Sequence, residues 1–258
     1  MERHEIVIVG AGPGGLRAAE ILAGRGMDIL ILERKRSVGD KICADGLSQN
    51  AIKLNYVPKE FYEREFMEIK LRMPNVILNL RGISPLVITF DRKKFCGWQK
   101  DNTEDKGGEI RLNSRVMDVN PDDAYLTTDK GEKIGYDILI GADGSYSTVR
   151  RALGLKNRYI FSYQYRHPRE LEDLEWGKDP KNVGAIGCYV FPHNGYTTLG
   201  LGWIPRKYGG IKKPDKDRFK SYWKGRGLVL EEDTELFRRH TSIHPQISMN
   251  QGIPSGLA

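Results

Sequence analysis

The chain has 258 residues, 29% of them charged, and 41 lysines and arginines against 34 aspartates and glutamates give a net charge of +7. This length allows one large domain or two modest ones, and the sequence has no apolar run of the roughly 20 residues that a membrane-spanning helix needs. The cationic excess favours anionic partners such as phosphate cofactors or acidic lipid surfaces, whereas we find no nucleic-acid-binding motif and expect no nucleic-acid partner.

The cysteines and the first residues indicate a cellular location. Cys43, Cys96 and Cys188 form no C-x-x-C pair and lack the spacing of a metal site. The first five residues lead directly into an apolar strand, without the features of a signal or transit peptide. We therefore expect no metal and a cytoplasmic location.

Residues 5–15 read EIVIVGAGPGG and carry the first functional pattern. The β-branched run Ile6–Val9 predicts a buried strand that enters a G-x-G-x-x-G turn. In such a turn Gly10 makes the tight bend, Gly12 lets the backbone approach a diphosphate, and Gly15 lets the following helix pack closely. The predicted diphosphate-binding residues are Gly10, Gly12, Pro13, Gly14 and Gly15. The diphosphate would lie at the positive end of the helix.

The segment after the glycine turn completes a dinucleotide-binding pattern. A helix is predicted at 16–23 and a second buried strand at 29–32. The strand ends at Glu33, about 20 residues after the turn, where an acidic residue accepts hydrogen bonds from the adenosine ribose. The basic triplet Arg34-Lys35-Arg36 that follows either forms a solvated loop or pairs with the cofactor diphosphate.

The middle of the chain alternates between strand and helix patterns. Alternation at 68–73 and 76–80 predicts strands of a second, antiparallel layer. Asp91 opens a helix that ends near Gly107. Strands are expected at 109–112, 115–119, 124–128 and 132–134, as a small β-meander above the main sheet. Residues 37–48 read as a loop near the cofactor.

A second strand-to-turn motif begins at Tyr136. The strand 136–140 leads into GADGSYSTVR at 141–150, followed by a helix that Ser147 can cap. Asp143, followed by Gly144, can accept a hydrogen bond from a ribose or ribityl hydroxyl. The alternative is an ordinary strand-to-helix turn.

With both motifs the chain resembles the flavoproteins that include aromatic hydroxylases and, more closely, the geranylgeranyl reductases. Their FAD domains join a G-x-G-x-x-G turn, a Glu such as Glu33, and a G-A-D-G-x-x-S-x-V-R segment. Arg92 matches the D-R-x-x-F arginine near the flavin diphosphate, and Cys96 replaces the family aspartate. The resemblance implies an α/β fold with an FAD-binding, Rossmann-like three-layer domain (1–66 and 91–156) containing the meander. A second, α+β domain (67–90 and 157–258) would carry a largely antiparallel substrate-binding sheet.

Two further segments resemble the reductase branch. KICADG at 41–46 is similar to its K-x-C-G-x-G loop, with Ala44 in place of glycine. The resemblance places Lys41 and Ala44 at the cofactor and Cys43 beside the flavin ring and the substrate; a lone cysteine is otherwise more often an inert small residue. GCYVFP at 187–192 is similar to the Y-x-W-x-F-P signature of the prenyl cavity. The predicted substrate residues are Tyr189, Phe191 and Pro192, and the alternative is an ordinary strand with core aromatics.

The resemblance implies an FAD-dependent reductase that hydrogenates C=C bonds of an isoprenoid chain of geranylgeranyl type. Reduced flavin would give hydride from N5, and Cys43 or a water it orders would supply the proton. The sequence shows no second dinucleotide turn. The electron donor would therefore be NAD(P)H that binds only transiently, or a reduced electron-carrier protein. Family members continue beyond a segment like 251–254 into a G-D-A-A-G motif that the sequence lacks, so we expect a C-terminally incomplete member. An aromatic-type FAD monooxygenase and a truncated, non-catalytic nucleotide-binding or interaction domain are the alternatives.

A short helix is predicted at 215–223, flanked by lysines and arginines. Phe219, Tyr222 and Trp223 recur at helical spacing and would either lie on an anionic membrane surface or pack onto the substrate sheet. The membrane alternative would make the protein peripheral at the inner face of the membrane.

Overall fold

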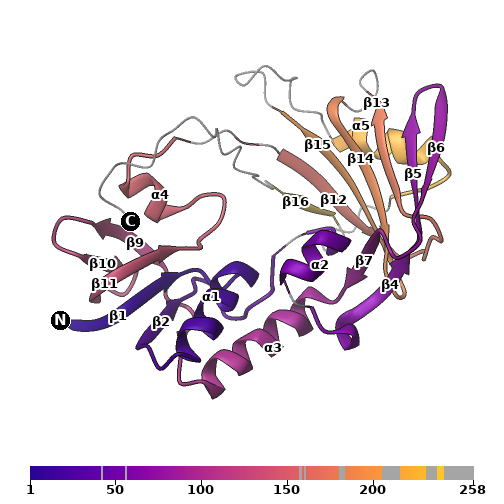
Figure 1. Cartoon of the computed structure of the whole chain (residues 1–258). Helices are drawn as coiled ribbons and strands as arrows, with labels where there is room; N and C mark the ends of the chain where they lie inside the picture. Colours follow the sequence, from indigo (N-terminus) through magenta and orange to yellow (C-terminus); the bar gives the residue numbers. More distant parts are fainter. Residues whose placement is uncertain are drawn as a thin grey trace.

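The computed structural model describes residues 1–41, 43–55, 57–156, 159, 161–179, 184–204, 216–230 and 237–240 (Figure 1). A six-stranded sheet in the order β8-β2-β1-β11-β10-β9 carries the N-terminal half. Its central strands are parallel: β1 pairs with β2 and β11, and β2 pairs with β8. The strands are β1 (Glu2–Val9), β2 (Ile29–Leu32), β8 (Glu109–Arg111), β9 (Val116–Asn120), β10 (Tyr125–Thr128) and β11 (Lys133–Gly141).

Both faces of this sheet are covered, which confirms the predicted three-layer arrangement. Helices α1 (Pro13–Ala23) and α3 (Arg92–Asp105) pack side by side on one face, where Leu16 and Cys96 join a buried cluster with β1 and β2. Apolar residues of β9 and β10 and Val149 of α4 (Thr148–Ala152) cover the other face.

The strands of the expected meander are arranged differently from the prediction. β8 is a parallel edge strand beside β2, because a strand that follows a crossover helix returns in the same direction. β10 pairs with β11 and with β9, so the meander of β9, β10 and β11 continues the main sheet through hydrogen bonds. Apolar residues of β9 and β10 also pack onto one face of β1 and β2. The two predicted strands 132–134 and 136–140 join into the single strand β11 (Lys133–Gly141), since Gly135 continues the ladder beneath the Arg3 side chain.

A seven-stranded sheet in the order β16-β12-β15-β14-β13-β5-β6 carries the second half. All its pairs are antiparallel except β13 with β5, which confirms a largely antiparallel second sheet. The strands are β5 (Glu68–Met73), β6 (Val76–Arg81), β12 (Phe161–His167), β13 (Glu175–Asp179), β14 (Gly184–Pro192), β15 (Thr197–Trp203) and β16 (Phe237–His240). The predicted 68–80 hairpin thus joins strands from the C-terminal half, whereas the domain boundaries themselves stay a prediction.

A three-stranded sheet, β3-β7-β4, lies between the two large sheets and was not predicted. It consists of β3 (Gly46–Ser48), β4 (Tyr62–Phe66) and β7 (Val87–Phe90), with the helix α2 (Gln49–Asn55) and the 3-10 turn η1 (Lys59–Phe61). β3 pairs with β7 directly after residues 43–45, here called the Cys43 segment. The small sheet therefore fixes one end of the segment in which the sequence places the active cysteine.

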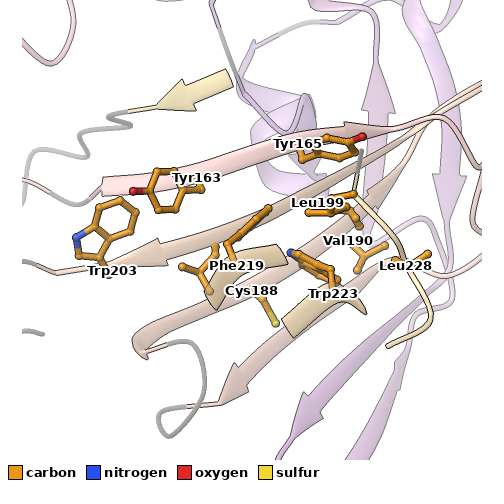
Figure 2. Close-up of a cluster of buried hydrophobic side chains, with 11 residues drawn as sticks. Tyr163, Tyr165, Cys188, Val190, Leu199, Trp203, Phe219, Trp223 and Leu228 are labelled. Atoms are coloured by element: carbon orange, nitrogen blue, oxygen red, sulfur yellow. The ribbon is translucent and has the colours of Figure 1, made fainter. Parts of the chain in front are cut away.

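Helix α5 (Lys216–Lys224) covers one face of the seven-stranded sheet, and Figure 2 shows its Phe219 and Trp223 among the buried side chains of that face. Phe219 and Trp223 are 1% and 0% exposed and pack against Tyr163, Cys188 and Val190. These rings belong to the core and do not form a membrane-binding face, because the sheet offers them a better apolar partner than water. The membrane interpretation of this helix is therefore wrong for Phe219 and Trp223. Within the described ranges, no helix is long and apolar enough to cross a bilayer.

Candidate cofactor and substrate site

The glycine turn has the tight geometry that its sequence predicts. Gly10 has a φ of 105°, and its N–H donates a hydrogen bond to the Leu32 carbonyl across 2.8 Å. A Cβ on Gly10 would lie 2.5 Å from the Ala142 oxygen, and one on Gly15 would lie 2.0 Å from the Gly10 oxygen. Side chains at either position would therefore separate α1 from the strands β1 and β11.

The other glycines of the turn face open space. A Cβ on Gly12 or Gly14 would meet nothing within 4 Å. Gly12 is the N-cap of α1 and makes no side-chain cap, and Pro13 occupies the first turn. The first N–H groups of an α-helix have no acceptor within the helix, and the open space at Gly12 and Gly14 leaves room for a diphosphate at the positive end of α1.

Glu33 lies beside this turn. Its Oε2 accepts a hydrogen bond from the Ala11 N–H, and its Oε1 accepts one from the Lys35 N–H, both at 2.9 Å. The carboxylate thus ties the end of β2 to the glycine turn. Its remaining lone pairs can accept from a ribose hydroxyl.

Asp143 provides the test of whether a cofactor fits. Its Oδ2 accepts from the N–H groups of Thr148 and Val149, at 2.6 and 3.3 Å, and so holds the start of α4. Its Oδ1 is buried and has no hydrogen-bond partner among the described residues. A buried carboxylate oxygen without a partner is costly, and a ribityl or ribose hydroxyl would satisfy it. Together with the open space at Gly12 and Gly14, this geometry fits FAD.

Several cations gather around the predicted diphosphate site. The ammonium of Lys41 lies 3.8 Å from the place of a Cβ on Gly144. Partial loss of water and the positive charges of Arg92, Lys35 and Arg34 lower the pKa of Lys41, although the side chain as a whole is exposed. A bound dianion would offset the repulsion between these cations and raise the pKa of Lys41 again.

Arg92 holds the segment that carries Cys43. Its Nε donates to Asp45 Oδ1 across 2.6 Å, and its Nη2 donates to the Cys43 Sγ across 3.0 Å. Burial raises the pKa of Asp45, against the opposing effect of the Arg92 guanidinium. Asp45 also has a φ of 51°, which costs a non-glycine residue about 1–3 kcal/mol and is typical of functional segments.

The predicted substrate residues lie on the far side of this segment. The rings of Tyr189 and Phe191 contact each other edge to face at 5.6 Å. Phe191 packs so closely that a Cβ on Gly46 would lie 2.1 Å from its ring, and Ala44 contacts the same apolar cluster. Burial, with the nearby Cys43, raises the pKa of the Tyr189 hydroxyl.

Pro192 ends β14 and is also buried. Its carbonyl accepts a hydrogen bond from the Thr89 hydroxyl across 2.9 Å. This bond links the end of β14 to β7, the strand that pairs with β3 directly after the Cys43 segment.

The other two cysteines are structural. Cys96 and Cys188 are 0% and 2% exposed. Burial raises the pKa of Cys96 to about 11 and also raises the pKa of Cys188. Neither thiol can compete with the half-buried Cys43 as a reactive group.

Five residues with side chains at or near this site were missed as functional groups by the sequence reasoning. They are Glu63, Gln164, Arg166, Trp176 and His193. Only His193 has a local signal, since it precedes the hairpin turn Asn194-Gly195. The others reach the site through strand pairing between distant segments.

Comparisons with known proteins agree with this geometry. The chain is 25% identical over 225 residues to digeranylgeranylglycerophospholipid reductase 2 of Methanococcoides burtonii, a match that covers 81% of this chain and 53% of that protein. A geranylgeranyl bacteriochlorophyll reductase-like protein of Thermoplasma acidophilum shares the fold, with a TM-score of 0.73 at 21% identity over 88% of this chain and 62% of the other. So does p-nitrophenol 4-monooxygenase of Pseudomonas putida, with a TM-score of 0.69 at 18% identity over 95% and 68%.

The chain spans about half the length of the curated reductase. The structural neighbours include both reductase-like and monooxygenase chains and therefore show the fold alone. A family model described as pyridine nucleotide-disulphide oxidoreductase matches residues 4–188, which include the glycine turn, Glu33, Cys43 and Asp143. The chain therefore belongs to the pyridine nucleotide-disulphide oxidoreductase family of FAD-binding proteins.

Proposed function

We propose that the protein is an FAD-dependent reductase that hydrogenates carbon–carbon double bonds of an isoprenoid chain in a lipid. The position of the Cys43 segment carries this proposal. Arg92 binds it on the side of the predicted diphosphate site, and Tyr189 and Phe191 of β14 contact it on the other side. The relatives named digeranylgeranylglycerophospholipid reductases support the same substrate class.

FAD would be held along the edge of the six-stranded sheet. The N–H groups of the turn at Gly12 and Gly14 would bind the diphosphate, with Lys41 nearby. Glu33 and the unpaired Oδ1 of Asp143 would accept hydrogen bonds from its hydroxyl groups. When bound and reduced, FAD supplies a hydride from N5.

The isoprenoid chain would lie along the face of the seven-stranded sheet opposite α5. Strand register places Tyr189, Trp176, Leu71 and Leu78 in one row across this face. Trp176 and Leu78 are 48% and 46% exposed, which leaves apolar surface available for a prenyl chain. Such a row would align an alkene beside the Cys43 segment.

Reduction of an alkene needs a hydride on one carbon and a proton on the other. Cys43, or a water that it orders, would give the proton. Arg92 Nη2 lies 3.0 Å from the sulfur and would stabilise the thiolate that remains until it is reprotonated from solvent. Asp45 holds the guanidinium in place for this role.

The electron donor would be NAD(P)H that binds transiently or a reduced carrier protein. A prenyl lipid lies in a bilayer, so the cytoplasmic protein would meet it as a peripheral partner of an anionic membrane surface, in keeping with the net charge of +7. Co-sedimentation with anionic liposomes, compared with neutral ones, tests this contact. If equal amounts of protein sediment with both, electrostatic attraction does not contribute to membrane binding.

The function is tested by loading the purified protein with FAD and supplying a reductant and a geranylgeranylated phospholipid. The proposal expects products heavier by one hydrogen molecule per reduced double bond, measured by mass spectrometry without oxygen. Product that forms only with oxygen and carries a hydroxyl group would select the monooxygenase alternative. Absence of FAD binding would select the non-catalytic domain.

A further inference from the structure

The backbone of the Cys43 segment is tethered by its carbonyl groups. Gln164 Nε2, from β12, donates to the Cys43 carbonyl across 2.7 Å. The N–H of Phe90, from β7, donates to the Asp45 carbonyl across 3.0 Å. The two donors come from different sheets, and between these two carbonyls lies that of Ala44.

The Ala44 carbonyl is bound by a buried histidine. His193 Nε2 lies 3.0 Å from this oxygen, and His193 Nδ1 lies 2.5 Å from Glu63 Oε2. A carbonyl only accepts, so Nε2 must carry hydrogen. Nδ1 faces the Glu63 carboxyl group, so this group and the Ala44 carbonyl fix the His193 ring from both sides.

The fold holds the His193 ring in this orientation. The side chain is 0% exposed and stacks on Tyr196, with ring centroids 4.5 Å apart and planes 5° from parallel. The His193 N–H donates to the Tyr196 carbonyl across the Asn194-Gly195 turn. Glu63, with 16% of its side chain exposed, comes from β4.

We infer that His193 and Glu63 form a positioning pair, which clamps the Ala44 carbonyl and so directs the Cys43 thiol toward Arg92 and the alkene. This inference rests on the proposed function for its catalytic meaning. The clamp itself is a property of the backbone and can be measured without turnover. Its loss would release the middle of a segment that Asp45 holds in a left-handed bend.

Hydrogen exchange in peptides that span residues 41–48 tests the clamp. His193→Leu removes the donor and should speed exchange there about three- to tenfold, the factor that loss of one hydrogen bond implies. His193→Gln returns an N–H donor near the Nε2 position and should restore exchange to within twofold of the wild-type value. His167→Leu, at another buried histidine that ends β12, is the matched control and should leave these peptides unchanged.

Unchanged hydrogen exchange of these peptides in His193→Leu would overturn the inference. Exchange that is faster throughout the chain, and equally so in His193→Leu and His193→Gln, would also overturn it, because it would show a general loss of stability. Should His193→Leu fail to fold, Glu63→Ala replaces it and should speed exchange in the same peptides at least twofold; no change there overturns the clamp equally. A clamp that is present in a protein unable to reduce prenyl lipids would contradict the proposed function alone. With prenyl reduction established, His193→Leu should lower kcat at unchanged KM, and His193→Gln should recover it.

Discussion

The Arg92 guanidinium donates a hydrogen bond to the Cys43 thiol across 3.0 Å, although the two residues are 49 positions apart in the chain. The same guanidinium donates to Asp45, which is 4% exposed. The arginine of the D-R-x-x-F element is therefore bound in this structure to the cysteine segment, a role that its predicted place near the diphosphate does not describe.

Replacing Arg92 should destabilise the fold. Arg92→Met leaves the buried Asp45 carboxylate without its hydrogen-bond partner and with only the more exposed Arg166, 3.9 Å away, as a counter-charge; we expect a loss of about 3 kcal/mol in the free energy of unfolding. Adding Asp45→Asn to Arg92→Met should recover part of this loss, because it removes the buried charge. Urea denaturation of the two variants measures both effects. A loss below about 0.5 kcal/mol in the single variant would show that the pair is unimportant.

Three glycines should separate fold from cofactor binding. Gly15→Ala places a Cβ 2.0 Å from the Gly10 oxygen and should destabilise the protein and abolish FAD binding together. Gly12→Ala meets no protein atom within 4 Å and should weaken FAD at least tenfold with little change in stability. Gly97→Ala, in α3 with equally open surroundings, is the control: it should leave FAD binding unchanged and stabilise the helix by up to about 1 kcal/mol.

Flavin titration and thermal unfolding of the three glycine variants measure these effects. Full FAD affinity in Gly12→Ala would contradict the assignment of the turn.

Asp143 should contribute to FAD binding beyond its role as a helix cap. Asp143→Ala loses the bond to the Thr148 N–H and also the unpaired Oδ1, so stability and FAD affinity should both fall, the affinity about tenfold. Ser147→Ala removes only the cap on the Arg150 N–H and should cost about 1 kcal/mol with unchanged FAD affinity. Equal FAD affinity in both variants, by fluorescence titration, would reduce Asp143 to a structural residue.

Glu175 should make the second sheet sensitive to acid. Burial alone would raise the pKa of Glu175, but the Arg72 and Arg226 guanidinium groups outweigh it and lower the pKa. A lowered carboxyl pKa in the folded state stabilises the protein above the unfolded pKa, and this stability is lost as pH falls below about 4. Glu175→Gln should therefore cost about 2 kcal/mol at pH 7 and much less at pH 3.

Glu68→Gln is the control for Glu175, because its partner Arg81 has a side chain that is 79% exposed. It should cost under about 0.5 kcal/mol at either pH. Urea titrations measure the free energy of unfolding of these variants at pH 7 and pH 3. If wild type and Glu175→Gln differ by the same amount at both pH values, the lowered pKa of Glu175 does not contribute to stability.

The nucleotide half was predictable because its signals are local. A β-branched strand, a glycine turn and a terminal carboxylate lie within about thirty residues, and each side chain acts on its near neighbours. Ser147 was correctly predicted as a helix cap for the same reason. Helix α1 begins at Pro13, three residues before the predicted start at residue 16, in keeping with the preference of proline for a first turn.

The remainder depends on contacts between distant segments. The three residues of β3 are too few to show a periodic pattern, and they form a strand only because β7 pairs with them. The aromatics of α5 have the same helical spacing whether they face a membrane or a sheet, and their burial against β12, β14 and β15 decides between the two. His193 and Glu63 are 130 positions apart, so no local pattern predicts that their side chains meet.

The central claim is that the Cys43 thiol takes part in alkene reduction. Its most direct test is the single-turnover rate at which reduced, FAD-loaded protein hydrogenates a prenyl lipid, compared between wild type and Cys43→Ala. Our account predicts a rate at least 100-fold lower in the variant, within the range for loss of a general acid, with FAD affinity and unfolding free energy unchanged. An undiminished rate in Cys43→Ala would contradict it.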